Sequence, residues 1–233
     1  QWSRHHRLFP GQGAFDLPAF LDQVQRTGYA GPLSLEVFND VFRQADPRRM
    51  AVDAMRSLLL LEGGLPEAAP LRGYAFAELA IEPEASAGVE RLLIAMGFRH
   101  AGQHRTKAVQ LWRHGDVRVL VNHDEGGDPR LTAIAVESAD PLRSAERAER
   151  LLAPVLSRDR GPGEADLSAI AAPDGTSVFF CRTDAADGWV GDFLSAGEPG
   201  PATELTGIDH VALSQPFDYF DEAALFYRSV LGL

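Results

Sequence analysis

The first 62 residues carry a helical, a strand-like and a second helical pattern of apolar positions in succession. Residues 16–27 predict an amphipathic helix, because Asp16 suits the N-cap, Pro18 suits the first turn and apolar residues recur three and four positions apart. Gly28 then ends it. Residues 33–38 (LSLEVF) predict a short apolar strand. We therefore expect a helix followed by a strand.

A second helix follows this strand. Asp46 suits its N-cap, Pro47 its first turn, and the pair Gly63 and Gly64 its end. Its predicted buried stripe consists of Met50, Met55, Leu58 and Leu59. Loop, helix, strand and helix are typical of a piece of an α/β fold. A single strand has no partner for the hydrogen bonds of its backbone N–H and C=O groups, so we expect this piece of the fold to be incomplete.

The pattern changes after a proline- and glycine-rich stretch at 63–72. Strands are predicted at 73–81, 107–112, 117–121, 131–136, 167–172 and 177–181, and helices near 89–96 and 140–152. These elements form two successive units, each with one strand, one helix and several strands. A third strand and helix, at 207–213 and 220–231, repeat the beginning of the first unit at nearly equal spacing, which indicates an internal repeat.

The charge, apolar content and cysteine count of the chain exclude some classes of partner and favour others. The net charge of −11 and the pI near 5.0 argue against a nucleic-acid partner and favour a small-molecule ligand. No stretch is apolar for long enough to span a membrane. The single cysteine, Cys181, cannot form an internal disulfide, and we expect a cytoplasmic protein that can form a homo-oligomer. Because the chain begins at Gln1 and stops just after Gly232, we also expect it to be a fragment.

Two sets of motifs resemble known families. Residues 7–13 (RLFPGQG), a following helix and residues 28–36 (GYAGPLSLE) are similar to the last strands and helices of sugar phosphate isomerase/epimerase TIM barrels. The units at 73–182 resemble the vicinal-oxygen-chelate fold of paired βαβββ modules, and residues 73–78 (GYAFAE) resemble the amino half of 4-hydroxyphenylpyruvate dioxygenase. A barrel fused to such a half is the arrangement of bacterial bifunctional 3-dehydroshikimate dehydratases. The sequences of residues 2–13 and 36–40 are also similar to that subfamily.

The resemblance implies a domain order. The implied fold class is the C-terminal remnant of an α/β barrel followed by α+β vicinal-oxygen-chelate modules. The predicted segments are a barrel piece at 1–62, a linker at 63–72, a metal-free first half at 73–186, a second linker at 187–204 and the start of a metal-binding half at 205–233.

In the barrel family a divalent cation, Mg, Mn or Co, is held by carboxylates and a neutral ligand from different strand ends, and Glu36 matches the last of these ligands. Hard cations prefer oxygen ligands, and residues at strand C-termini face the reaction site of a barrel. The alternative is an ordinary, partly exposed glutamate at a strand end. The resemblance implies that the other ligands, and the catalytic base, lie outside the chain.

Two residues near the start are candidates for substrate binding. Arg7 lies in a loop shaped by proline and glycine, where a guanidinium could clamp the carboxylate of a cyclic hydroxy acid, although a solvated loop arginine is the alternative. Of the neighbours His5 and His6, at most one is expected to face a substrate. Asn39 could orient Glu36 or cap the turn that follows it.

A second metal site is implied by the dioxygenase resemblance. The context of His210, Asp-His-Val, is like that of the first of the two histidines that hold Fe(II) with one carboxylate in the carboxyl half. The alternative is an ordinary strand histidine whose ring nitrogens are hydrogen-bonded within the fold. The equivalent position in the first unit is Phe76, which cannot bind a metal, and Glu78 should face the same way as Phe76.

Three functions follow as hypotheses. The first is a metal-dependent lyase of aromatic catabolism that removes water from 3-dehydroshikimate to give protocatechuate. The second is a 4-hydroxyphenylpyruvate dioxygenase-type Fe(II) oxygenase. The third is a dioxygenase-like half that serves as a non-catalytic ligand-binding or assembly module.

Overall fold

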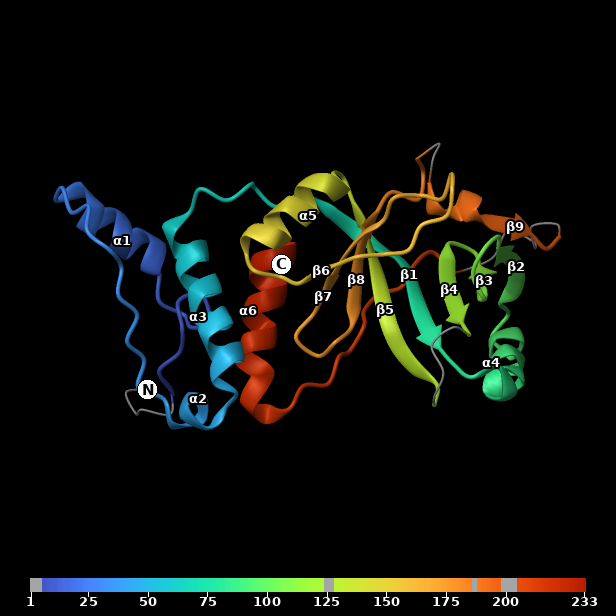
Figure 1. Ribbon diagram of the computed structural model, residues 1–233, viewed down its shortest axis with the longest axis horizontal. Helices are drawn as coiled ribbons and strands as arrows, with labels where there is room; N and C mark the ends of the chain where they lie inside the picture. The colour runs from blue at the N-terminus through green and yellow to red at the C-terminus, as the bar shows by residue number, and fades with distance from the viewer. Residues whose placement is uncertain (1–5, 124–127, 186–187, 198–204) are drawn as a thin grey trace. The chain divides into compact units, whose positions relative to one another are not determined.

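A computed structural model describes residues 6–123, 128–185, 188–197 and 205–233 of the chain (Figure 1). The chain divides into two compact units. Unit 1 comprises Gln1–Ala68, Glu146–Pro154 and Leu213–Leu233, and unit 2 comprises Ala69–Ala145 and Val155–Ala212. Each unit is described by itself below.

Unit 1 is helical in its described residues. Its helices include α1 (Leu17–Arg26), α2 (Asp40–Gln44), α3 (Pro47–Glu62) and α6 (Phe220–Leu231), and α3 and α6 lie side by side (Figure 1). The predicted caps are confirmed, since Asp16 accepts a hydrogen bond from the Ala19 amide at 3.0 Å and Asp46 accepts from the Arg48 amide at 2.9 Å. The short helix α2 was not predicted.

The predicted buried stripe of α3 is confirmed at Met50 and wrong at Met55, while Leu58 and Leu59 are half-buried. The structure buries Met50, Asp53, Arg56 and Ser57, whereas Met55 is 51% exposed. These four positions lie on one face at helical spacing. The predicted helix is therefore correct, but its most buried face is not the one predicted. Three of the four are polar, and apolar content alone could not have selected them.

The predicted strand at 33–38 has no regular secondary structure. A strand needs a neighbour for its backbone N–H and C=O groups. In the described part of unit 1 no strand is present to pair with it. The barrel piece therefore stays an expectation.

Unit 2 contains a nine-stranded mixed sheet in its described residues. The strands are β1 (Leu71–Ala80), β2 (Arg99–His104), β3 (Val109–His114), β4 (Val117–Asn122), β5 (Arg130–Ser138), β6 (Val155–Leu156), β7 (Ser168–Ala171), β8 (Ser177–Cys181) and β9 (Phe193–Ser195). Their order is β6-β7-β8-β5-β1-β4-β3-β2-β9.

This order contains the same module twice. β1 pairs with β4 in parallel, β5 pairs with β8 in parallel, and β1 and β5 meet antiparallel at the centre. A helix follows the first strand of each module, α4 (Pro83–Ala95) after β1 and α5 (Pro141–Arg150) after β5. The two predicted βαβββ units are therefore present as modules of one sheet.

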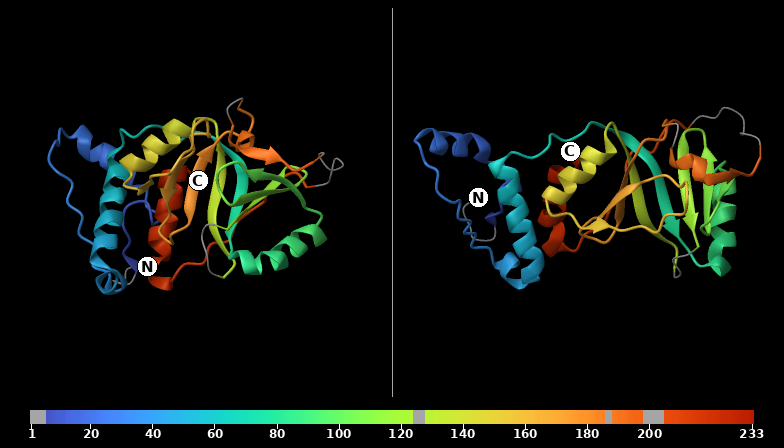
Figure 2. Two further views of the ribbon diagram at one scale, coloured as in Figure 1. Left: turned by 45° about the vertical axis from the view of Figure 1, so that its right-hand side comes forward. Right: turned by 45° about the horizontal axis from the view of Figure 1, so that its top comes forward.

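Figure 2 shows the strands of this sheet from two further sides. The sheet separates two apolar clusters. On one face Phe76, Leu111, Leu120, Phe179 and Trp189 pack together with smaller residues. On the other face Leu93 of α4 packs with residues of β3 and β4, including Trp112 and Val121. Neighbouring residues such as Leu111 and Trp112 fall on opposite faces, as the two-residue period of a strand requires.

The predicted strand at 207–213 also lacks regular structure. Just before this segment, the Leu205 carbonyl accepts a hydrogen bond from the Asp116 amide at 2.9 Å. The strand β9, which was not predicted, pairs with β2. Among the described residues, no helix is both long enough and apolar enough to cross a bilayer.

Candidate functional site

Asn39 connects the two segments of unit 1 that carry predicted site residues. Its side-chain amide donates to the Arg7 carbonyl at 2.8 Å, and its side-chain oxygen accepts from the Val41 amide at 2.8 Å. Asn39 is 2% exposed, so both bonds are shielded from water. It therefore caps α2 and ties residues 36–40 to the loop of Arg7, rather than bonding to Glu36.

The side chains of Glu36 and Arg7 are exposed. Neither forms a hydrogen bond or ion pair with another described residue. The structure thus brings their backbone segments together while leaving a carboxylate and a guanidinium open to solvent. Groups of this kind can bind a cation and an anion, respectively.

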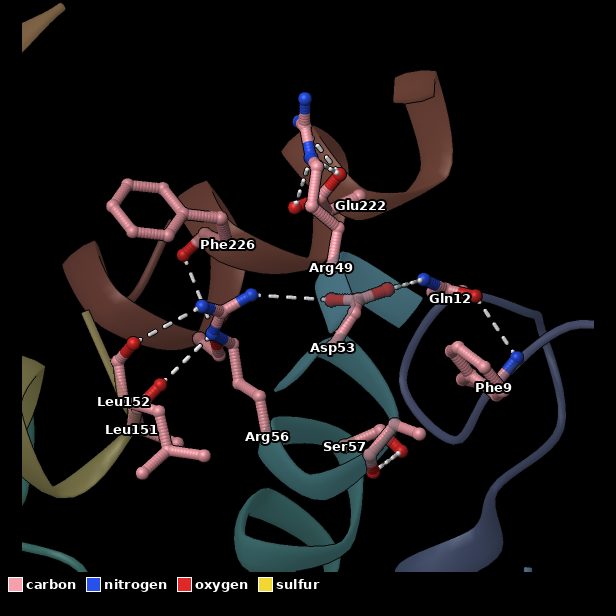
Figure 3. Close-up of polar contacts among 12 residues, drawn as sticks. Phe9, Gln12, Arg49, Asp53, Arg56, Ser57, Leu151, Leu152, Glu222 and Phe226 are labelled. Carbon is pink, nitrogen blue, oxygen red and sulfur yellow. Dashed lines mark hydrogen bonds and ion pairs between the residues drawn. The ribbon is translucent and has the colours of Figure 1, made fainter. Parts of the chain in front are cut away.

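The loop that follows Arg7 is held on α3 through Gln12 (Figure 3). The Gln12 side chain accepts from the Phe9 amide at 2.9 Å and donates to Asp53 at 2.7 Å. Gly11 has a φ of +84°, which favours glycine, and the Phe9 ring lies 4.6 Å from the Phe42 ring between centroids. Local geometry and long-range contacts together fix this loop.

Asp53 and Arg56 form a buried ion pair at the centre of this network (Figure 3). Their side chains lie 3.2 Å apart and are 1% and 3% exposed. Arg56 also donates to the Leu151 carbonyl at 2.9 Å, and its guanidinium lies 5.3 Å from the Phe226 ring centroid. One arginine thereby links three segments of unit 1.

A second charged pair joins α3 to α6. Arg49 donates to both Glu222 oxygens, with the shortest distance 2.8 Å (Figure 3). Its guanidinium lies 3.9 Å from the Tyr219 ring centroid. Glu222 is 7% exposed. Such a bidentate pair fixes orientation as well as distance.

Burial raises the pKa of Asp53 from its ordinary value of 3.8 to about 7. The Arg56 charge and the hydrogen bonds from Gln12 and Arg56 act in the opposite direction, whereas the nearby Glu222 charge adds to the increase. Burial also lowers the pKa of Arg56. The Asp53 carboxyl therefore changes its charge near neutral pH.

The remaining predicted site residues lie elsewhere. His5 falls outside the described residues. His210 belongs to unit 2, its side chain is 81% exposed, and its Nδ1 lies 2.8 Å from an Asp209 oxygen. Within the described ranges, no three His, Cys, Asp or Glu residues converge as a metal site would require.

Sequence reasoning missed the pair Asp53 and Arg56. The available signal was an acid and a base three positions apart on one helical face, between the predicted core residue Met50 and the small residue Ser57. Such a pair is most often a solvated surface pair, and its burial depends on the carbonyls and the loop that reach it from distant parts of the chain.

The chain is similar to one protein family and to several known enzymes. Residues 67–180 match the family model described as hydroxyphenylpyruvate dioxygenase, HPPD, N-terminal. The chain is 36% identical to a 3-dehydroshikimate dehydratase of Pseudomonas putida over 99% of its own length and 41% of that relative. It is 29% identical to a 4-hydroxyphenylpyruvate dioxygenase of a Pseudomonas species over 47% of the chain and 32% of the relative.

A solved structure is also similar to this chain over nearly its whole length. A protein described as a xylose isomerase-like TIM barrel/4-hydroxyphenylpyruvate dioxygenase fusion matches with a TM-score of 0.87 and 35% identity, over 99% of this chain and 42% of the other. The chain thus spans about two fifths of the length of the relatives that it matches throughout. The resemblance seen in the sequence is confirmed: over nearly its whole length the chain is similar to 3-dehydroshikimate dehydratases and to a barrel–dioxygenase fusion protein.

Proposed function

We propose that this chain is part of an enzyme that removes water from 3-dehydroshikimate to give protocatechuate. The observation that carries the proposal is the 36% identity to curated dehydratases over 99% of the chain. In this proposal residues 1–62 are the end of the barrel, 63–72 and 187–204 are linkers, 73–186 are the metal-free half and 205–233 begin the metal-binding half.

Within the barrel piece, Glu36 contributes one carboxylate ligand to a divalent cation, Mg, Mn or Co. Arg7 binds the carboxylate of the cyclic substrate, and His5 contacts the same ligand. The contacts of Asn39 support this assignment, because they hold the Arg7 loop beside the segment of Glu36. The exposure of both side chains supports it as well, since each is accessible to a ligand.

The described residues do not fit a complete metal centre, because no three potential ligands converge among them. Glu36 alone would hold a divalent cation weakly, since such ions take several oxygen ligands. We therefore assign Glu36 as one ligand of a larger set and derive no reaction step through the metal.

The proposal is tested with the natural protein that contains this chain. Protocatechuate formation from 3-dehydroshikimate is measured before and after chelation of divalent cations, and again after separate addition of Mg, Mn and Co. We expect activity to be lost on chelation and restored by at least one cation. Full activity in the chelated protein, or no protocatechuate under any condition, would contradict the proposal.

A second candidate function is Fe(II)-dependent oxygenation by the dioxygenase-like region. It is favoured by the match at 67–180 and by the exposed side chain of His210, which is open to a ligand set from elsewhere. We expect His210→Ala to abolish Fe(II)-dependent oxygen uptake with an aromatic 2-oxo acid. If the unmodified protein takes up no oxygen with Fe(II) and such a substrate, this function is excluded and the region is a non-catalytic module.

A further inference from the structure

Unit 2 contains a cavity of about 300 Å³ against the sheet face that carries Phe76. Residues from both βαβββ modules and from the segment between β6 and β7 line it. This volume lies at the lower end of the range for small-molecule sites, roughly 300–1,000 Å³, and therefore suits a ligand with a single ring.

Aromatic side chains form much of the cavity wall. They are Phe76, Phe179, Trp189 and Phe193. The Phe76 ring lies 4.8 Å from Trp189 and 5.8 Å from Phe179 between centroids. Flat, weakly hydrated rings favour a flat, unsaturated ligand, because stacked and edge-to-face contacts then replace contacts with water.

One cation at the cavity is available to a ligand. The Arg158 guanidinium lies 4.9 Å from the Phe179 ring centroid, and the residue is exposed. It forms no ion pair with any residue in the described part of the chain. A guanidinium placed beside an aromatic wall is suited to bind the carboxylate of a ring compound through two parallel hydrogen bonds.

A hydrogen-bond acceptor lies in the sheet that lines the cavity. Glu78 of β1 lines the cavity together with Phe76, as the alternation of the strand predicts, and accepts from the Asn122 amide at 2.7 Å. A carboxylate can accept several hydrogen bonds at once. Glu78 can therefore also receive a ring hydroxyl from a ligand.

The other charges around the cavity are paired and hold its walls. Lys107 lies 2.7 Å from Glu164, which also accepts from the Gly161 amide at 3.0 Å. Asp192 pairs with Arg105 and accepts from the Ala165 amide at 3.0 Å. Hydrogen bonds from Lys107, Thr106 and Gly161 lower the pKa of Glu164 to about 2, so this pairing persists at neutral pH. The segment that carries Arg158 is thus fixed at its far end.

We propose that this cavity is a binding site for a monocyclic aromatic carboxylate with ring hydroxyl groups, with Arg158 on the carboxylate and Glu78 on a hydroxyl. The ligand class follows from the cavity alone and does not depend on the proposed dehydratase activity. Protocatechuate, the product of that activity, belongs to this class. Both proposed contacts are made by side chains of this chain, so we expect binding to persist when a chelator is present.

The test is a calorimetric titration of the chain with 3,4-dihydroxybenzoate in the presence of a chelator. We expect saturable binding with one ligand per chain, accompanied by a change in Trp189 fluorescence, since Trp189 lines the cavity. Arg158→Gln should weaken binding by at least about tenfold, because a charge-assisted hydrogen-bonded contact is lost. Catechol, which lacks the carboxylate, should bind the variant and the unmodified chain equally well.

The matched control is Arg160→Gln. Arg160 is also exposed, pairs with Asp166 at 3.1 Å and does not line the cavity, so this variant should bind 3,4-dihydroxybenzoate with unchanged affinity. Absence of saturable binding at millimolar ligand would overturn the proposal. So would equal losses in the two variants, or a loss of catechol binding by Arg158→Gln. Because binding is measured without turnover, failure here is distinguishable from failure of the dehydratase proposal.

Discussion

Glu36→Gln is expected to reduce dehydratase kcat/KM by at least about 100-fold in the natural protein that contains this chain. Changes to residues that only support a metal ligand typically cost about 10–100-fold, so replacing a direct ligand should cost no less. The amide keeps the size of the side chain and removes its charge. Glu36 is exposed and bonds to no described residue, so the fold should be unaffected.

Two measurements separate this loss from unfolding. The thermal midpoint of the Glu36→Gln variant should match that of the unmodified protein, and raised cation concentrations should recover part of the activity. Glu62→Gln is the matched control, because Glu62 is also exposed and lies at the end of α3. If Glu36→Gln keeps activity within about twofold, Glu36 is not a ligand.

Arg56→Met should reduce the free energy of unfolding of this chain by about 3–5 kcal/mol at a pH near 8, the usual cost of leaving one partner of a buried ion pair alone. Methionine fills similar space along the side chain but leaves the Asp53 carboxyl without its cation and the Leu151 carbonyl without its donor. Denaturant unfolding monitored by circular dichroism measures the loss.

The loss should be smaller near pH 5. The folded chain keeps the Asp53 proton up to a pKa of about 7, whereas the unfolded chain releases it near 3.8. Between these values the folded state binds more protons, so the contribution of Asp53 to stability falls as the pH rises. At pH 5 a protonated Asp53 needs no cation beside it. The stability lost in Arg56→Met, which comes from burying a charged Asp53 without its cation, should therefore appear mainly above pH 7.

Arg48→Met controls for the loss of a positive charge on the same helix. Arg48 is exposed, so its replacement should change stability by less than about 0.5 kcal/mol at either pH. Equal losses for Arg56→Met at pH 5 and pH 8 would contradict the assignment of a titrating carboxyl to Asp53.

The sequence predicted elements best where local chemistry decides them. The caps at Asp16 and Asp46 and the proline that follows Asp46 place two helix starts correctly, because each side chain satisfies amides within its own first turn. Most strands of the two modules were also predicted, since they alternate or are continuously apolar, but β2 and the two-residue β6 were missed. The segments 33–38 and 207–213 failed because strand formation depends on a distant neighbour that the local pattern cannot reveal.

The site was less predictable than the fold. The residue types at Glu36 and Arg7 suggested binding, but Asn39 could be assigned to its capping role only once its contacts with Arg7 and Val41 were seen. The burial of Asp53 and Arg56 and the grouping of Arg158, Glu78 and Phe179 around one cavity depend on contacts between residues far apart along the chain. No local pattern carries that information.

The central pairing of β1 with β5 has a consequence for how unit 2 reaches its native state. Ala77 pairs with Ile134, far along the chain, so the two modules join only after a long loop has closed. Until then the apolar face shared by Phe76 and Phe179 is open to neighbouring molecules. Newly synthesised chains should therefore be vulnerable to aggregation during this interval, and dilution or a chaperone should increase the yield of refolded protein.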